Sequence, residues 1–349
     1  MKWGKYKMNK MMKMKHLISL SHYSREDVLE LIELAMKIKK GEISPSLKGK
    51  SLVLLFFNPS LRTRTSFELA MQQLGGNVVC LNAGEDTWKL ELEEGVVMDK
   101  DSVEHIKDAA AVLGRYADAI GVRAFPRGVS WEEDRQDRVI ESFVRYGGVP
   151  VINMESSLYH PNQALGDMMT MMERFGKNMR GIPITIAWAN HPKSLPMAVP
   201  NSILLVCALF GMEIRLLRPP GYDLDTAIME KAEELSRNAG GKIIVTDDFD
   251  RGFRGSRVVY AKSWGSIRFY GKKEEELKYR KSLKGWIVDD EKMAKTDNAF
   301  FMHCLPVRRN VVATDSVLDS EYSIIYEEAY NRLPAQKAVL CRILGDNPF

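Results

Sequence analysis

The sequence predicts an α/β protein with two doubly wound domains, each built on a mainly parallel sheet. Strand-like apolar runs alternate with segments of helical period, and this alternation occurs in both halves of the chain. A length of 349 residues with 45% hydrophobic content is sufficient for two cores. We expect a disordered basic extension over residues 1–13, a first domain over 14–156 and a second domain over 157–324.

The first half opens with a capped helix and then a buried strand. Ser24 is a suitable N-cap for a helix over residues 25–39, where apolar side chains recur at helical spacing. Residues 51–57 are typical of a strand buried on both faces, and Gly75-Gly76 closes a helix predicted over 65–74. Further strands are predicted at 78–81, 119–122 and 150–153, with helices at 102–116 and 134–146 between them.

The second half of the chain shows the same alternation of strand-like and helical segments. We predict strands at 183–188, 213–217, 242–245, 257–260 and near 300–303, helices at 201–210 and 225–239, and a last helix, apolar on one side, at 325–344. Four methionines between Met168 and Met172 have helical spacing, and we expect them to pack in a core.

Charge and cysteine usage limit the possible partners. The 50 basic and 46 acidic residues are scattered and give a net charge of +4, so we expect no nucleic-acid partner but leave a small anionic substrate open. The short basic N-terminus keeps nucleic-acid binding as a minor alternative. Four distant cysteines and six isolated histidines predict no disulfide framework, no structural metal and a reducing, cytoplasmic location. We see no signal peptide and no run long enough to span a membrane.

One short stretch indicates an anion site. Ser60, Arg62, Thr63, Arg64 and Thr65 stand where a predicted strand ends and a helix starts, so free backbone N–H groups and arginine forks would face the same ligand. An ordinary helix cap with its arginines in solvent is the alternative. The chain lacks a Walker loop and a Gly-x-Gly-x-x-Gly fingerprint, so an ATPase or a dehydrogenase is disfavoured.

Five ordered motifs carry a resemblance to a known family. Ser-x-Arg-Thr-Arg from Ser60 resembles the carbamoyl-phosphate motif of the aspartate/ornithine carbamoyltransferases. The later motifs, in the family's order, are Gly121-Val122-Arg123-Ala124-Phe125, His160-Pro161-Asn162-Gln163, His303-Cys304-Leu305-Pro306 and Asn331-Arg332. The resemblance covers nearly the whole chain from about His16.

The resemblance implies a set of site residues. Those implied to bind carbamoyl phosphate are Ser60, Leu61, Arg62, Thr63, Trp88, Arg123, His160, Gln163, Cys304, Leu305 and Arg332, and the catalytic ones among them are Arg123, His160, Cys304 and Arg332. Trp88 would come from a neighbouring subunit. Each side chain also has an ordinary structural alternative, and Cys304 has a second one as a nucleophile, which would need a paired base and a lowered pKa.

The amino-acid substrate follows from a closer resemblance. The Ser-Met-Gly loop of ordinary ornithine enzymes is absent, and Ala261-Lys262-Ser263-Trp264 is similar to the branch that acts on N-acylated ornithine. Val103 stands where acetyl-specific relatives carry glutamate and succinyl-specific relatives proline, and Val312 stands where acetyl-specific relatives tend to carry lysine. Because glutamate would repel a succinyl carboxylate, we favour N-succinyl-L-ornithine, with N-acetyl-L-ornithine and then free ornithine as alternatives. The implied acylornithine-binding residues are Val103, Glu155, Lys262 and Arg308.

The family further implies transfer of a carbamoyl group to the δ-amine in arginine biosynthesis, without a cofactor or metal. It implies a homotrimer, a C-terminal segment 325–349 that returns to the first domain, and a knot near the proline-rich loop at 191–200.

Overall fold

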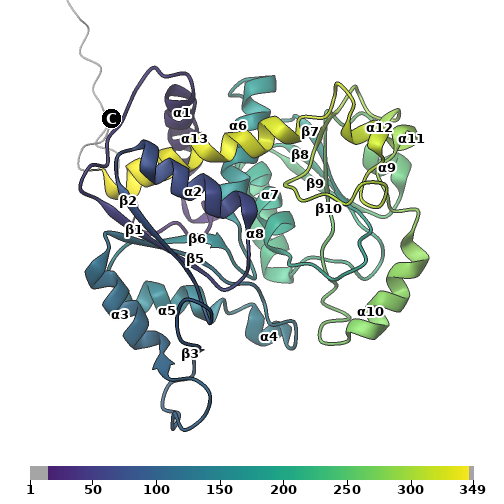
Figure 1. Cartoon of the computed structure of the whole chain (residues 1–349). Helices are drawn as coiled ribbons and strands as arrows, with labels where there is room; N and C mark the ends of the chain where they lie inside the picture. Colours follow the sequence, from purple (N-terminus) through teal and green to yellow (C-terminus); the bar gives the residue numbers. More distant parts are fainter. Residues whose placement is uncertain (1–14, 346–349) are drawn as a thin grey trace, which may run out of the picture.

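Two parallel sheets organise the computed structural model, which describes residues 15–345 (Figure 1). The extension over 1–13, predicted to be disordered, and residues 346–349 lie outside the described residues. The first sheet has the order β2-β1-β5-β6 and the second β11-β10-β7-β8-β9, and each pairing within them is parallel. The predicted α/β class with mainly parallel sheets is confirmed.

The central strands are apolar because helices cover both of their faces. In the first sheet, β1 is almost wholly buried, and its Leu52 pairs with Val78 on one side and Ala119 on the other. The strands of this sheet are β1 (Ser51–Phe56), β2 (Asn77–Asn82), β5 (Ala119–Arg123) and β6 (Val151–Glu155). A separate short pair, β3 (Leu90–Glu91) and β4 (Glu104–His105), lies beside it.

The second sheet repeats this design. Its strands are β7 (Pro183–Trp188), β8 (Glu213–Leu217), β9 (Lys242–Thr246), β10 (Val258–Lys262) and β11 (Phe300–Met302). The long helices on one of its faces are α7 (Ala198–Leu209) and α8 (Thr226–Ala239), and short helices cover the other: α9 (Phe249–Phe253), α11 (Asp290–Met293) and α12 (Asp315–Leu318) (Figure 1). Helix α10 (Lys273–Arg280) and the 3-10 turn Lys281–Leu283 lie at the edge of this layer.

Helices on the two faces of the first sheet come from distant parts of the chain. One face carries α3 (Ile106–Tyr116) and α5 (Arg138–Tyr146); the other carries α1 (Arg25–Lys39), which follows the 3-10 turn Leu20–His22, α2 (Leu61–Gln73) and α13 (Ile325–Leu344) (Figure 1). Helix α13 packs against α1, α2 and α6 (Pro161–Phe175), so the C-terminal helix returns to the first domain as predicted. Met168, Met169, Met171 and Met172 of α6 are buried in this junction, which confirms their predicted core role.

Four predicted helix boundaries were wrong, one because of tertiary contacts and one because of a proline in the first turn. The helix predicted over 134–146 is split into α4 (Trp131–Asp134) and α5, because Asp137 adopts φ +44° while its carboxylate accepts hydrogen bonds from Ser156 and from the Ser157 N–H. The helix predicted from 201 starts at Ala198, since Pro200 falls in the first turn, where no N–H is required.

The other two errors concern caps. Helix α2 starts at Leu61 rather than 65 because Ser60 caps it, and α3 starts at Ile106 rather than 102 because His105 caps it after β4. Helix α6 was expected only in part, as methionines at helical spacing.

The division at residues 156 and 157 and the knot at 191–200 stay predictions. No helix within residues 15–345 combines the length and the apolar character needed to cross a bilayer.

Candidate active site

The carboxyl ends of the two sheets face one cavity of about 440 Å³, the position where open α/β sheets usually bind ligands. Its walls come from the ends of β5, β6 and β10, the start of α2, the start of α6, and α13. The lining residues are Pro59, Ser60, Leu61, Arg62, Thr63, Arg123, Phe125, Glu155, His160, Gln163, His191, Leu195, Pro196, Val199, Lys262, Cys304, Leu305, Pro306 and Arg332.

The start of helix α2 forms one wall. Ser60 is the N-cap, and its Oγ accepts a hydrogen bond from the Thr63 N–H at 3.2 Å. The preceding amides of the first turn have no intrahelical acceptor, and the positive end of the helix dipole points the same way. The sequence analysis treated a helix cap and an anion site as alternatives. In the structure, the same turn is capped by Ser60 and also lines the cavity.

Three guanidinium groups converge on the cavity, from α2 (Arg62), from the end of β5 (Arg123) and from α13 (Arg332). The Nε of each lacks a hydrogen-bond partner among residues 15–345. Arg332 is buried and donates through Nη2 to Thr63 Oγ1 at 2.6 Å. Burial, and then the charge of Arg62, lowers the pKa of Arg332 to about 10, so it remains a cation at neutral pH. Converging guanidinium groups that keep unused N–H donors predict an anionic ligand.

A β-bulge places the carboxylate that partly balances this charge. Val122 of β5 pairs with Asn153, but the next residue, Arg123, pairs with Glu155. The extra residue turns the Glu155 side chain toward the cavity, where it forms an ion pair with Arg123 Nη1. The Arg123 guanidinium also lies 4.4 Å from the centre of the Phe125 ring. Arg123 is therefore held on two sides.

His160 is buried and electrically neutral. It precedes α6, whose first residue is Pro161, and its backbone N–H donates to Ser202 Oγ at 2.8 Å. Burial, and then the charges of Arg332 and Arg123, holds the pKa of His160 well below its ordinary value. Its Nε2 lies 3.6 Å from Glu155 Oε2, while Nδ1 has no partner in the described part of the chain. A neutral imidazole can offer a hydrogen bond without adding charge.

Gln163 lines the cavity, and its amide nitrogen is held from behind. Its Nε2 donates to Asp167 Oδ1 at 2.7 Å and to Glu328 Oε1 at 3.3 Å. Its Oε1 has no partner within residues 15–345. Both donors are occupied, so a ligand at this wall must bring an N–H or O–H of its own.

Cys304 is a neutral thiol in the wall. Burial raises its pKa to about 11. The neighbouring His303 accepts the Leu305 N–H on Nδ1 at 2.9 Å, and so that nitrogen is not free to act as a base. The nucleophile alternative therefore lacks both of its requirements. The Leu305-Pro306 peptide bond is cis, and both residues line the cavity.

Two of the predicted acylornithine residues line the cavity, and Arg308 is next to it. Lys262, at the end of β10, and Glu155 are in the wall. Arg308 is outside the wall and donates through Nε to Nε2 of His191, which does line the cavity, at 2.9 Å.

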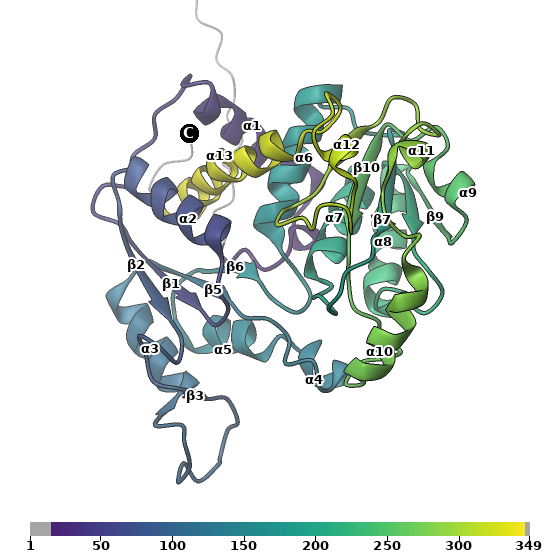
Figure 2. The same ribbon diagram turned by 45° about the vertical axis from the view of Figure 1, so that its right-hand side comes forward.

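Trp88 and Val103 are not brought into the cavity of their own chain. They are 68% and 62% exposed and belong to the segment between β2 and α3 that projects from the body (Figure 2). Such exposure of large apolar side chains is common at contacts between subunits.

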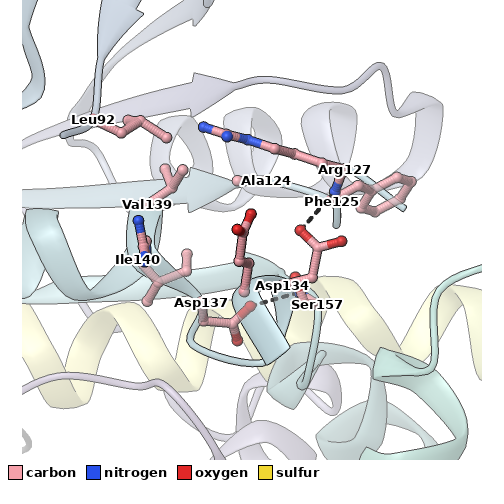
Figure 3. A pocket seen from close by; sticks show the side chains of 11 residues that line it. Leu92, Ala124, Phe125, Arg127, Asp134, Asp137, Val139, Ile140 and Ser157 are labelled. Atoms are coloured by element: carbon pink, nitrogen blue, oxygen red, sulfur yellow. Dashed lines mark hydrogen bonds between the residues drawn. The ribbon is translucent and has the colours of Figure 1, made fainter. Parts of the chain in front are cut away.

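A second cavity of about 70 Å³ lies under the end of β5 and is structural (Figure 3). Figure 3 shows the Asp134 and Asp137 carboxylates beside it. Asp134 accepts the N–H groups of Arg127 and Gly128 at 2.9 and 2.7 Å, and Asp137 accepts the Ser157 N–H at 2.8 Å. These carboxylates hold the backbone of nearby loops through hydrogen bonds. The larger cavity differs, because its side chains include polar atoms without a hydrogen-bond partner in the described residues.

Two protein-family models match this chain, and both agree with the ligand expected at this site. A model described as "Aspartate/ornithine carbamoyltransferase, carbamoyl-P binding domain" matches residues 15–173, and one described as "Asp/Orn binding domain" of the same family matches residues 183–343. The chain belongs to the aspartate/ornithine carbamoyltransferase family. It is therefore a carbamoyltransferase, as the motif order predicted.

Named relatives place this carbamoyltransferase in the N-acylornithine branch. The N-acetylornithine carbamoyltransferase of Xanthomonas campestris pv. campestris is 46% identical over 338 residues, 96% of this chain and 99% of the relative. The N-succinylornithine carbamoyltransferase of Bacteroides fragilis is 39% identical over 301 residues, 86% of this chain and 89% of the relative.

A solved structure of an N-acetyl-L-ornithine transcarbamylase is also similar. It is a variant with a glutamate replaced by valine, complexed with carbamyl phosphate and N-succinyl-L-norvaline. It has a TM-score of 0.92 and 46% identity, and the match covers 95% of this chain and 100% of that chain.

The sequence analysis missed His191 in the cavity wall, and Asp167 and Glu328 behind it. His191 was part of the proline-rich loop, and nothing in the pattern indicated that it lines the cavity. Glu328 has no local signal, because its partners Gln163 and His303 are distant in sequence, whereas Asp167 is one helical turn from its partner Gln163.

Proposed function

We propose that this carbamoyltransferase transfers the carbamoyl group of carbamoyl phosphate to the δ-amine of an N-acylated L-ornithine, giving N-acyl-L-citrulline and phosphate. The observation that carries the proposal is the convergence of Arg62, Arg123 and Arg332 with the start of α2 on one buried cavity. A small dianion is the ligand that such a site fits best.

The phosphate lies at the α2 end in this proposal. Ser60, Leu61, Arg62 and Thr63 bind it through side chains and backbone amides, and Trp88 approaches from a neighbouring subunit. Negative charge moves to the departing phosphate as the reaction proceeds, and fixed donors stabilise that charge without rearranging.

The carbamoyl group lies between α6 and α13. Thr63, Arg123, His160 and Arg332 surround its carbonyl oxygen, where charge builds during attack. The Gln163 Oε1 and the Leu305 carbonyl accept its N–H groups. Holding the carbonyl carbon in this way supplies much of the catalysis by orientation, and no covalent intermediate is needed.

The attacking amine must be neutral and close to the carbonyl carbon. Glu155 borders the cavity beside Arg123 and His160, and we assign it the role of positioning the amine. The Cys304 thiol packs against the carbamoyl group as a neutral wall residue in this scheme.

The acyl group has two candidates. Sequence identity favours an acetyl group, because the N-acetylornithine relative is 46% identical to this chain and the N-succinylornithine relative is 39% identical. Val103 favours succinyl, because a glutamate there would repel the distal carboxylate. The similar structure with a glutamate replaced by valine holds an N-succinyl ligand, which supports the same direction. We propose N-succinyl-L-ornithine as the preferred substrate, with N-acetyl-L-ornithine as the second candidate.

We further propose a homotrimer with active sites at the subunit borders. Trp88 and Val103 then complete the site of a neighbour, which accounts for their exposure in the isolated chain.

The test is a comparison of kcat/KM for N-succinyl-, N-acetyl- and free L-ornithine at saturating carbamoyl phosphate. We expect the succinyl substrate to lead and Val103→Glu to shift the succinyl-to-acetyl ratio toward acetyl by about tenfold or more. Val129→Glu, at another exposed valine, is the matched control and should leave the ratio unchanged. An acetyl preference in the unaltered protein would overturn the succinyl assignment, and a free-ornithine preference would overturn the branch.

A further inference from the structure

Two buried carboxyl groups lie directly behind the carbamoyl end of the cavity. Asp167 is on α6 and Glu328 on α13, and each is 0% exposed. Neither lines the cavity or has a part in the scheme above. Burying two carboxyl groups side by side is costly, so their contacts need an explanation.

Glu328 connects the structures that hold the carbamoyl group. Its Oε1 accepts from Gln163 Nε2 at 3.3 Å, and its Oε2 accepts the His303 N–H at 2.8 Å. It is also one helical turn before Arg332 on α13. The Gln163 side chain, the segment leading to Leu305, and Arg332 are thereby fixed relative to one another.

Asp167 completes the restraint on Gln163. Its Oδ1 accepts the shorter of the two bonds from Gln163 Nε2, at 2.7 Å. The Asp167 and Glu328 carboxyl groups interact with each other, and burial raises the pKa of Asp167 to about 7 and that of Glu328 well above its ordinary value. A pair that retains a proton on Glu328 leaves Asp167 as an acceptor for the amide.

We propose that Asp167 and Glu328 are positioning residues that hold the Gln163 amide with Oε1 in the cavity, and that this orientation selects carbamoyl phosphate against acetyl phosphate. The inference deepens the proposed function and rests on it for the identity of the donor substrate. The two phosphates differ by an NH2 group in place of a methyl group of similar size. Shape alone therefore discriminates poorly between them.

Carbamoyl phosphate is preferred because acetyl phosphate would leave hydrogen-bond acceptors of the protein without a donor. Carbamoyl phosphate brings N–H donors to Gln163 Oε1 and to the Leu305 carbonyl. Acetyl phosphate brings a methyl group, which would leave buried acceptors without partners. If the Gln163 amide were free to turn, its NH2 would face the cavity, oppose the carbamoyl NH2 and no longer penalise the methyl group.

The experiment measures equilibrium binding of carbamoyl phosphate, acetyl phosphate and inorganic phosphate by thermal shift, without any ornithine derivative. We expect Asp167→Ala and Glu328→Ala each to lower the preference for carbamoyl over acetyl phosphate by about tenfold, the equivalent of one hydrogen bond. Inorganic phosphate affinity should stay constant, because it binds at the α2 end. Asp167→Asn, whose side-chain oxygen can still accept from Gln163, should retain most of the preference.

A double-mutant cycle separates positioning from general damage. In a Gln163→Met background, which lacks the amide, Asp167→Ala should change the preference no further. Asp118→Ala is the matched control, since Asp118 accepts the Ser51 N–H at 2.7 Å at the amino ends of the central strands, opposite the carboxyl ends that face the cavity. If one of the two alanine variants does not fold, the double-mutant cycle is measured with the other.

The outcomes distinguish the two proposals. An unchanged preference in both alanine variants, or an equal loss for all three phosphates, overturns the positioning role. Failure of the unaltered protein to carbamoylate any ornithine derivative overturns the proposed function, whatever the binding ratios show.

Discussion

Individual buried charges differ in how completely they are satisfied. Arg280, outside the cavity wall, donates to Glu276, to the Trp264 carbonyl at 2.7 Å and to Ser263 Oγ at 3.1 Å, and it serves the fold. The cavity guanidinium groups keep an unpartnered Nε within the described residues, and His160 keeps an unpartnered Nδ1. An unpartnered atom alone does not mark a ligand-binding residue, because Arg218, outside the cavity wall, also has an unpartnered Nε. The site is distinguished by the convergence of several incompletely hydrogen-bonded groups on one cavity.

Asp137 is a structural carboxylate with a testable pH signature. Burial raises its pKa to about 6, against hydrogen bonds from Ser156 and Ser157 that lower it. The folded state therefore holds this proton more tightly than the unfolded chain, whose Asp has a pKa near 3.8. The contribution of Asp137 to stability is thus greatest at low pH and falls as pH rises through about 6.

We expect the stability difference between the wild type and Asp137→Asn to be about 1 kcal/mol larger at pH 5 than at pH 7.5. Asparagine does not titrate, and it tolerates the φ of +44° at this position. Urea denaturation of both proteins at the two pH values measures the effect. A difference that is constant or that grows with pH would refute the assignment.

Whole elements create the site by the way they end and by how closely they approach. Strand β1 ends at the capped start of α2, and the bulge between β5 and β6 turns Glu155 inward. Helix α13 lies so close to α6 at Gly166 that a Cβ there would be 3.3 Å from Arg332 Cγ and 3.4 Å from its backbone nitrogen. This glycine permits the approach that brings Arg332 to Thr63.

Gly166→Ala should therefore act on catalysis more than on folding. The added methyl group moves Arg332 by a few tenths of an ångström, and we expect kcat/KM for carbamoyl phosphate to fall about tenfold, since small misplacements of orienting groups are costly. The gain in helix propensity should offset part of the packing strain, so that Tm changes little. Steady-state kinetics and thermal melts measure both. Gly285→Ala is the control, because open space surrounds that position. Unchanged kinetics would show that the helix contact is not limiting.

At the scale of the whole molecule, the isolated chain exposes side chains that belong to the predicted site. The segment carrying Trp88 and Val103 projects from the first domain (Figure 2), and neither residue lines the cavity of its own chain. In the proposed homotrimer, this segment of one copy would reach the cavity of the next.

Mixing two defective variants tests this arrangement. Arg332→Ala and Trp88→Ala should each be nearly inactive alone. Dissociated and reassembled in equal amounts, they should regain about a quarter of the wild-type sites, where an intact cavity meets an intact Trp88. Activity against mixing ratio measures the recovery. No recovery in a mixture that demonstrably forms hybrid trimers would place Trp88 in its own subunit's site.

Much of the fold was predictable because its signals are local. Strands such as 183–188 and helices such as 25–39 were predicted at their observed ends, since apolar period and caps act over a few residues. The split at Asp137 could not be predicted in this way, because hydrogen bonds from beyond β6 break a helix that periodicity favours. The other boundary errors concern local caps and a first-turn proline.

By itself, the sequence determined the α/β class, the order of the elements and the motifs that identify a carbamoyltransferase. Only the tertiary structure decided that three arginines from residues 62 to 332 share one cavity, that a bulge aims Glu155 at Arg123, and that Asp167 and Glu328 hold the Gln163 amide nitrogen. The physical reason is the separation along the chain over which each interaction acts. Helix period, caps and motifs depend on neighbours along the chain, whereas charge balance and hydrogen-bond orientation depend on groups that folding alone brings together.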